Sequence, residues 1–137
     1  MITNRIAQVF LGLMALAFCK VGVEAMVNPQ AVVEPVGITL DNPSALSSIR
    51  AVYGGMHFMF GLLCLWSVFK RPAPALWLVA LYTTGFLAGR TIALLVDGTP
   101  NEFVLTWFGT EAFSLAASVV LLVLLQQRVR SVSTAAA

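Results

Sequence analysis

Charged side chains are scarce in this sequence. Its 137 residues include 8 Lys and Arg and 6 Asp and Glu, or 10% of the chain, whereas a soluble domain has about 25%. The basic residues form no run longer than Lys70-Arg71, so we expect no binding to nucleic acid. One histidine and two distant cysteines, Cys19 and Cys64, offer too few ligands for a transition-metal centre and no Cys-x-x-Cys motif. We therefore expect neither a metal nor a cofactor.

Long apolar stretches make up most of the sequence. Hydrophobic residues make up 59% of the chain. Stretches of about 20 apolar residues, enough to cross roughly 30 Å of hydrocarbon, predict four transmembrane helices. Their expected ranges are 6–26, 43–69, 74–96 and 102–127. Asn42 before Pro43 is typical of an N-cap followed by proline at the first helical position. We thus expect one all-α domain over residues 1–137, a polytopic bundle of four transmembrane helices.

The charges at the helix ends predict an orientation in the membrane. The cations at one set of ends are Arg5, Lys70, Arg71, Arg128 and Arg130. The anions at the opposite ends are Glu34, Asp41, Asp97 and Glu102. Because cytoplasmic loops are rich in Lys and Arg, the cationic ends are expected in the cytoplasm, together with both termini.

The connection between the first two helices, residues 27–42, is the most apolar of the loops. Pro29 and Pro35 punctuate it, Pro43 follows it directly, and these prolines are expected to prevent a helix there. We expect it to fold over the outer ends of the helices as a lid, because protein rather than lipid must satisfy its backbone groups. A strap that only covers these ends is an equally good interpretation, since composition does not reveal what a loop does.

Six ionisable side chains lie within the expected helices or at their ends. They are Lys20, Glu24, Arg50, Arg90, Asp97 and Glu111. Because the helices alternate in direction, all six are expected at a similar depth in the outer part of the bilayer. An unpaired charge at the centre of a transmembrane helix costs roughly 2.5–3.5 kcal/mol. The six groups are therefore expected to meet one another, water or a ligand.

Helical spacing suggests how these groups could converge. One face of the second helix is expected to carry Arg50, Tyr53, Gly54, His57 and Gly61. On the third helix Thr83, Arg90 and Asp97 are seven residues apart, and on the fourth Glu111, Ser114 and Ser118 share a face. The expected site is thus a common centre for the six charges, with His57 and Tyr53 beside it.

Glycines are expected where helices approach closely. Gly85 and Gly89 form a GxxxG pattern, which allows the backbone of a neighbouring helix to come near. Gly54, Gly55 and Gly61 are expected to serve the same purpose on the second helix.

Two interpretations of the charged cluster remain open. In the first, which we favour, it is a structural network that joins Arg90 to Glu111 and Lys20 to Glu24 at i,i+4. In the second, Arg50 and Arg90 bind an anionic head group in a pocket, Glu111 orients them, and His57 or Tyr53 donates a hydrogen bond.

One stretch resembles a known family. Ile49-Arg50-Ala51-Val52-Tyr53-Gly54-Gly55, with Gly89-Arg90, Asp97-Gly98 and Glu111 further along, is similar to a group of small bacterial membrane proteins classed as a domain of unknown function. That group is remotely similar to DoxX-like proteins, and the likeness covers about residues 37–125. It implies four helices, a multi-pass protein of the bacterial inner membrane, and importance for the motif residues. It implies no activity.

The sequence favours a function that is not enzymatic. No P-loop, dinucleotide fingerprint or nucleophile elbow occurs, so no catalytic residue is predicted. We expect an accessory or interaction subunit of a larger membrane complex, with membrane lipid and other subunits as partners. The alternatives are a binder or carrier of an anionic lipid or amphiphile in an outer-facing polar pocket and, third, a membrane enzyme acting on a lipid.

Overall fold

Four long apolar helices form the protein. The computed structural model describes residues 2–135, with side chains for residues 2–128, so the side chain of Arg130 lies outside it. The elements in chain order are α1 (Ile2–Val27), α2 (Pro29–Val33), the 3₁₀-helix η1 (Glu34–Val36), α3 (Pro43–Ile49), the π-helix η2 (Arg50–Met56), α4 (His57–Phe69), α5 (Pro72–Val96) and α6 (Glu102–Ala135). No strand occurs in the part of the chain that the structure describes.

Four continuous helical segments are long and apolar enough to cross a membrane. They are Ile2–Val27, Pro43–Phe69, Pro72–Val96 and Glu102–Arg128. The predicted all-α class and the four spans are therefore confirmed. The first helix begins at Ile2, earlier than the expected residue 6, and the third begins at Pro72 instead of residue 74. Asn42 is the predicted N-cap, since its Oδ1 accepts a 2.9 Å hydrogen bond from the backbone N–H of Ala45.

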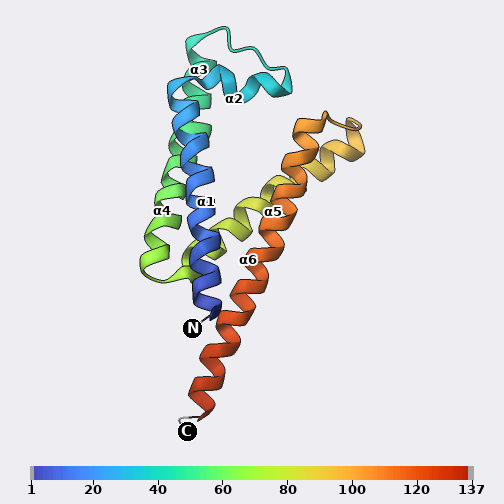
Figure 1. The fold of residues 1–137 in the computed structure, drawn as a ribbon. Coiled ribbons are helices and arrows are strands. Elements are labelled where there is room, and N and C mark those ends of the chain that lie inside the picture. Colours follow the sequence, from blue (N-terminus) through green and yellow to red (C-terminus); the bar gives the residue numbers. More distant parts are fainter. Residues whose placement is uncertain (1, 136–137) are drawn as a thin grey trace.

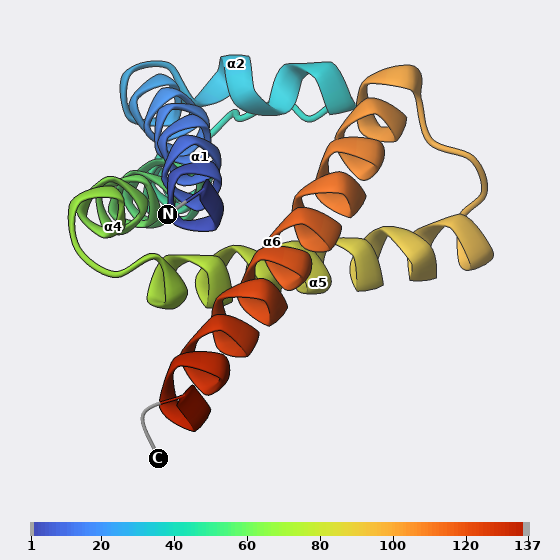
Figure 2. The ribbon, with the colours of Figure 1, turned by 60° about the horizontal axis from the view of Figure 1, so that its bottom comes forward.

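The helices are arranged as two packed pairs. α1 lies against α4, and α5 lies against α6 (Figure 1). The pairs meet near the N-terminus and diverge toward the opposite end of the molecule, as the view in Figure 2 also shows. Both described chain ends lie on the same side of the bundle (Figure 1), as four crossings require.

The core explains where the two pairs join. Its buried side chains are Ala7, Leu11, Ala15, Phe18, Cys64, Ala75, Leu76, Val79, Leu121 and Leu122. These residues come from the start of α1 and α5 and from the later parts of α4 and α6, so they gather at one end of the bundle. The other end has fewer buried apolar side chains to hold the pairs together.

Glycines allow α1 and α4 to touch. A Cβ atom on Gly61 would collide with the Sγ atom of Cys19, and it would lie 3.0 Å from the backbone nitrogen of Cys19. A Cβ on Gly22 would lie 2.7 Å from the backbone nitrogen of Phe58. Only glycine fits at such a close approach of two backbones. Gly61 thus lies at a close helix contact, and Gly22 is an additional contact that the sequence did not reveal.

The connection after α1, residues 28–42, forms a strap across one end of the bundle. The prediction that its prolines prevent a helix is wrong, because α2 and η1 occupy much of it. Pro29 and Pro35 stand in the first turns of these helices, where a missing N–H costs nothing. The side chain of Gln30 closes the strap by donating to Ile38 O at 2.9 Å and accepting from Leu40 N at 2.8 Å.

The strap links the two helix pairs. It leaves the end of α1 and reaches the start of α6 (Figure 2). There the side-chain amide of Asn101 donates a 2.7 Å hydrogen bond to the carbonyl of Pro35. We call this end of the bundle the strap end.

A π-helix interrupts the second span. η2 covers Arg50–Met56 between α3 and α4, with the adjacent glycines Gly54 and Gly55 within it. Its wider i→i+5 turn advances the chain by a smaller angle per residue than an α-helix does. Arg50 and His57, which are seven residues apart across η2, therefore no longer share a face of the helix.

Candidate functional site

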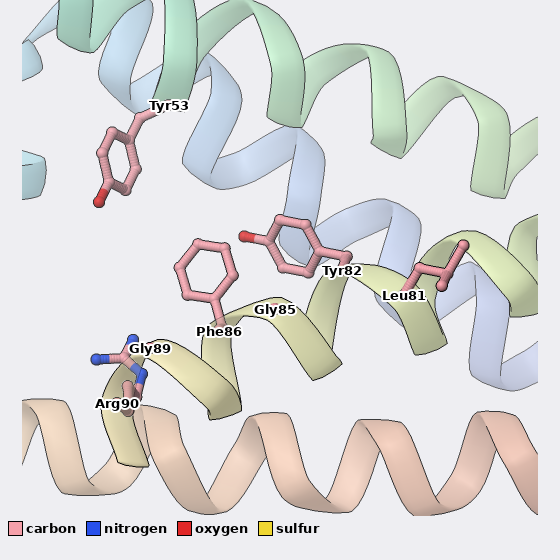
Figure 3. A pocket seen from close by; sticks show the side chains of 7 residues that line it. All are labelled: Tyr53, Leu81, Tyr82, Gly85, Phe86, Gly89 and Arg90. Carbon is pink, nitrogen blue, oxygen red and sulfur yellow. The ribbon is translucent and has the colours of Figure 1, made fainter. Parts of the chain in front are cut away.

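A cleft opens where the two helix pairs begin to diverge. It has a volume of about 540 Å³ and is lined by Tyr53, Leu81, Tyr82, Gly85, Phe86, Gly89 and Arg90. Tyr53 belongs to η2, and the other six residues belong to α5 (Figure 3). The volume lies within the range of roughly 300–1,000 Å³ that is typical of ligand pockets.

Two neighbouring rows of side chains along α5 shape this cleft. Tyr82, Phe86 and Arg90 follow one another at intervals of four, which places them one above another on the helix. Leu81, Gly85 and Gly89 form the adjacent row at the same spacing. The first row is bulky and the second nearly bare, so α5 presents a wall beside a shallow floor (Figure 3).

A bidentate ion pair holds the only charged side chain that lines the cleft. The Nε of Arg90 donates to Glu111 Oε2 at 2.7 Å, and its Nη2 donates to Oε1 at 2.9 Å. The Glu111 side chain is 8% exposed and that of Arg90 is 23% exposed. The guanidinium carbon also lies 5.8 Å from the centre of the Phe86 ring, within cation–π distance. α6 therefore fixes the guanidinium at the edge of the cleft.

Three N–H groups of this guanidinium remain available. Arginine has five donors, and Glu111 uses one at Nε and one at Nη2. Within residues 2–128 no hydrogen bond to the two donors at Nη1 or to the second donor at Nη2 occurs. A hydrogen bond to an acceptor stabilises a donor that is partly buried. The cleft therefore offers a binding position for acceptor oxygens.

Aromatic rings close the side of the cleft toward α1 and α4. The Tyr82 hydroxyl lies 2.6 Å from Nε2 of His57, and the Tyr53 ring stacks on the His57 ring with centres 5.5 Å apart. Tyr82 also contacts Phe18 edge-on at 5.1 Å and Phe86 at 4.6 Å. These contacts give the cleft a rigid aromatic wall.

Comparison with known proteins gives the family. The family model for a domain of unknown function, DUF4345, matches residues 6–123. The chain belongs to the DUF4345 family. No curated protein and no solved structure is significantly similar to it. The predicted membership in a family of unknown function is confirmed, whereas the remote likeness to DoxX-like proteins stays a prediction.

The match includes every residue of the cleft. It also includes Glu111 and His57, which lie behind the lining side chains. Membership in DUF4345 assigns no activity to them, so their role has to be argued from geometry.

The structure contains both ion pairs that the network interpretation predicts. Arg90 binds Glu111, and the Nζ of Lys20 lies 3.1 Å from Glu24 Oε2. The second pair is on the surface of α1, with side chains 76% and 43% exposed. Lys20 and Glu24 therefore do not join the cleft, and the expectation of one common centre for six charges is wrong for them.

Arg50 and Asp97 also lie apart from the cleft. Arg50 is exposed, and its Nε donates a 3.1 Å hydrogen bond to the carbonyl of Met26 in the last turn of α1. The π-helix explains this, because it turns Arg50 away from the face that carries Tyr53 and His57. Asp97 is exposed after the end of α5, where its backbone N–H donates a hydrogen bond to the carbonyl of Ala93. The predicted pocket thus keeps Arg90, Glu111 and Tyr53, with His57 behind them.

On α6, the predicted shared face is correct. Glu111, Ser114 and Ser118 are all buried, at 6%, 5% and 0% exposure. On α5, by contrast, Thr83 is buried and donates to the carbonyl of Val79 at 2.7 Å, so it does not line the cleft with Arg90.

The remaining glycines behave differently from one another. Gly54 packs closely, since a Cβ there would lie 2.8 Å from Cγ of Met26. A Cβ on Gly55, Gly85 or Gly89 would meet nothing within 4 Å. Within the described residues no helix approaches these three glycines, because the helix pairs diverge at this level, so their predicted role in helix packing stays a prediction. Gly85 and Gly89 line the cleft instead.

Sequence reasoning missed Tyr82, Phe86 and Leu81. The signal was present as the i, i+4, i+8 spacing of Tyr82, Phe86 and Arg90. A heptad spacing from Arg90 pointed to Thr83 and Asp97 instead. Spacing of four residues predicts better than spacing of seven which side chains lie beside Arg90 on this helix, since residues four apart are in contact on a helix surface.

Proposed function

We propose that this member of the DUF4345 family is a membrane protein that binds an anionic amphiphile in the cleft beside α5. The observation that carries the proposal is the state of Arg90. Glu111 clamps the guanidinium, and three of its N–H groups remain without an acceptor in residues 2–128. Carboxylate or phosphate oxygens match such donors best.

The depth of Arg90 suits a head group. Arg90 is seven residues from Asp97, the residue that follows α5, so it lies about 10 Å along the axis from the helix end. That distance is near the edge of the hydrocarbon layer, where an anion can keep contact with water. The hydroxyl of Tyr53 lies across the cleft, at the same end as the guanidinium (Figure 3), and is a second candidate donor to the head group.

The rest of the cleft suits an apolar tail. Leu81, Phe86 and the two glycines carry no polar side-chain atom. Leu81 is 68% exposed in the structure, so this part of the cleft opens toward the surface that faces lipid. An amphiphile could therefore enter sideways from the membrane rather than from water.

The test is lipid mass spectrometry on the protein purified in a neutral maltoside detergent. The native chain is compared with the double variant Arg90→Gln/Glu111→Gln, which removes both charges and keeps side chains that hydrogen-bond each other. We expect the native chain to retain an anionic amphiphile and the double variant to lose it. Equal retention by both proteins would refute the proposal.

A second candidate function is the accessory subunit that the sequence favours. Its specific support is the uncovered row of Leu81, Gly85 and Gly89, which a transmembrane helix of another protein could contact through its backbone. A partner that binds there should copurify in mild detergent with the native chain and be lost from Gly85→Leu. A native chain that purifies alone as a stable monomer would count against this function.

We also propose that both termini are cytoplasmic in a bacterial inner membrane. The arrangement of charge supports this: Glu34, Asp41 and Asp97 lie at the strap end, and Lys70-Arg71 lies in the turn at the other end. A phosphatase that is active only outside the cytoplasm, fused after residue 137, should be inactive. The same phosphatase inserted between Asp97 and Gly98 should be active, and the reverse pattern would overturn the orientation.

A further inference from the structure

The cleft carries its charge at one end. Its one charged side chain, Arg90, lies on the part of α5 that leads to the strap end. Leu81 lies nine residues earlier, about 13 Å along the axis from Arg90 and just past the middle of α5. Between them the cleft is lined by the Phe86 ring and by the bare backbone of Gly85 and Gly89 (Figure 3).

This polarity matches that of a lipid within one leaflet. A lipid in the leaflet at the strap end has its head group near the helix ends and its tail toward the middle of the bilayer. An amphiphile whose head group binds Arg90 would therefore direct its tail toward Leu81 without turning. The cleft and the surrounding lipid align the ligand in the same way.

The dimensions of the cleft favour one chain. The floor is a single row of α5, with the wall of Tyr82 and Phe86 on one side and Tyr53 across the opening. This single row offers one hydrocarbon chain a surface to lie on, and the second chain of a phospholipid would find no matching row among the lining residues.

Resting on the function proposed above, we infer that the ligand is a monoacyl anionic amphiphile whose single chain lies along Leu81, Gly85 and Gly89. Two sources share this chemistry. A fatty acid presents a carboxylate to Arg90, and a lysophospholipid presents a phosphate. Both groups accept hydrogen bonds from a guanidinium, so the identity of the head group is left to the experiment.

The two glycines provide clean probes of the chain position. A Cβ on either meets nothing within 4 Å, so a leucine there begins in open space and extends its side chain into the cleft. Gly109 on α6 is the matched control, because it is also exposed, has the same free space and does not line the cleft. All three variants lose one helical glycine and gain one leucine.

The experiment measures binding of defined probes to purified full-length protein. The probes are palmitate, lysophosphatidic acid, two-chain phosphatidic acid and the neutral palmityl alcohol. We expect Gly85→Leu and Gly89→Leu to weaken binding of the preferred monoacyl probe by about tenfold or more, and Gly109→Leu to change it by less than about twofold. We expect phosphatidic acid and the alcohol to bind at least about tenfold more weakly than that probe.

A second measurement needs no variant. A fatty acid with a photoreactive diazirine at the end of its chain should label the α5 peptide that contains Leu81. Competition by unlabelled palmitate or lysophosphatidic acid shows which head group the site prefers. Labelling confined to α1 or α6 would overturn the chain position, even if a leucine variant failed to fold.

The outcomes separate this inference from the proposed function. If no anionic probe binds the native chain better than it binds Arg90→Gln/Glu111→Gln, the proposed function itself fails. If a probe needs Arg90 but binds both leucine variants normally, the head-group site stands and the chain position is wrong. If phosphatidic acid binds as well as the monoacyl probes, the restriction to one chain is wrong.

Discussion

The hydroxyl of Tyr82 donates a hydrogen bond to Nε2 of His57. The two atoms are 2.6 Å apart, and Nδ1 of the same ring lies 3.2 Å from the carbonyl of Val52. A carbonyl can only accept, so Nδ1 carries a proton and Nε2 of the neutral ring is the acceptor for Tyr82. The pair joins α5 to the start of α4 immediately behind the cleft. It connects the two helix pairs at the level where they begin to separate.

The first prediction separates stability from ligand binding at this wall. In Tyr82→Phe the ring remains, but the buried Nε2 of His57 loses its donor, which costs about 1–3 kcal/mol. Because the ring that lines the cleft remains, we expect a lower unfolding temperature in detergent and a smaller loss of affinity for the anionic probe than in Tyr53→Phe.

Tyr53→Phe is the matched control and should do the opposite. The Tyr53 hydroxyl makes no hydrogen bond within residues 2–128. Its loss should leave the unfolding temperature unchanged and weaken binding of the probe. If the two variants behave alike, Tyr82 and Tyr53 do not have separate roles.

The second prediction concerns the charge of Glu111. In Glu111→Gln the amide oxygen can still accept from Arg90, but the guanidinium is no longer neutralised. We expect the protein to be destabilised by roughly 1–3 kcal/mol, because Arg90 loses a charged partner. We also expect an anionic probe to bind roughly threefold tighter or more, since the positive charge now acts on the ligand alone.

The control for that variant is a neutral probe. Palmityl alcohol carries no charge, so its affinity should be the same for the native chain and for Glu111→Gln. An anionic probe that binds Glu111→Gln more weakly would contradict this prediction and show that positioning of Arg90 by the carboxylate outweighs the charge that the carboxylate neutralises.

Much of the architecture was predictable because lipid restricts what a chain can do. Four apolar stretches of sufficient length had to become helices, and all four did. Arg90 and Glu111 could be paired from sequence, because an unpaired charge at their depth is costly. Asn42 could be predicted as an N-cap because asparagine is preferred at that position and Pro43 follows it.

The site was less predictable, because two tertiary features decide it. The π-helix at Arg50–Met56 uses ordinary residues, so periodicity could not show that Arg50 would face away from His57. The divergence of the two helix pairs depends on where core side chains interlock, which no single helix reveals. That divergence is the reason why Gly85 and Gly89 line a cleft rather than a helix contact.

The third prediction tests the place of Arg50. The structure has it bound to the last turn of α1 through Met26 O, where a cation also interacts favourably with the helix dipole. Arg50→Gln should lower stability by only about 0.3–1 kcal/mol and leave the affinity for the anionic probe unchanged. Arg71→Gln, at the opposite end of the bundle, is the control for loss of one positive charge. A selective loss of affinity in Arg50→Gln would restore Arg50 to the binding site.

The fourth prediction tests the contact between α1 and α4. In Gly61→Ala the new methyl collides with Cys19, including its backbone nitrogen at 3.0 Å, so the helices must move apart. Overpacking of this kind costs about 1–3 kcal/mol. Gly109→Ala has open space and should be neutral or stabilising by up to about 1 kcal/mol, because alanine favours a helix more than glycine does. Equal unfolding temperatures for the two variants would contradict the close packing.

The last prediction concerns Asn101, which has two separate hydrogen-bonding roles. Its Oδ1 accepts from the backbone N–H of Val104 at 3.0 Å, as an N-cap of α6 does, and its Nδ2 donates to Pro35 O in the strap. Asn101→Asp keeps the capping oxygen and loses the donor, whereas Asn101→Ala loses both. We expect faster hydrogen exchange at the strap amides of Gly37 and Ile38 in both variants.

At the start of α6 the two variants should differ. Exchange at Val104 and Leu105 should accelerate only in Asn101→Ala, which loses about 0.5–2 kcal/mol of capping free energy. Because the strap connects the end of α1 to the start of α6, its release should also let the helix pairs separate further at the strap end. The anionic probe should then dissociate faster from both variants. Strap exchange that stays at the native rate in Asn101→Asp would mean that the Pro35 contact does not hold the strap.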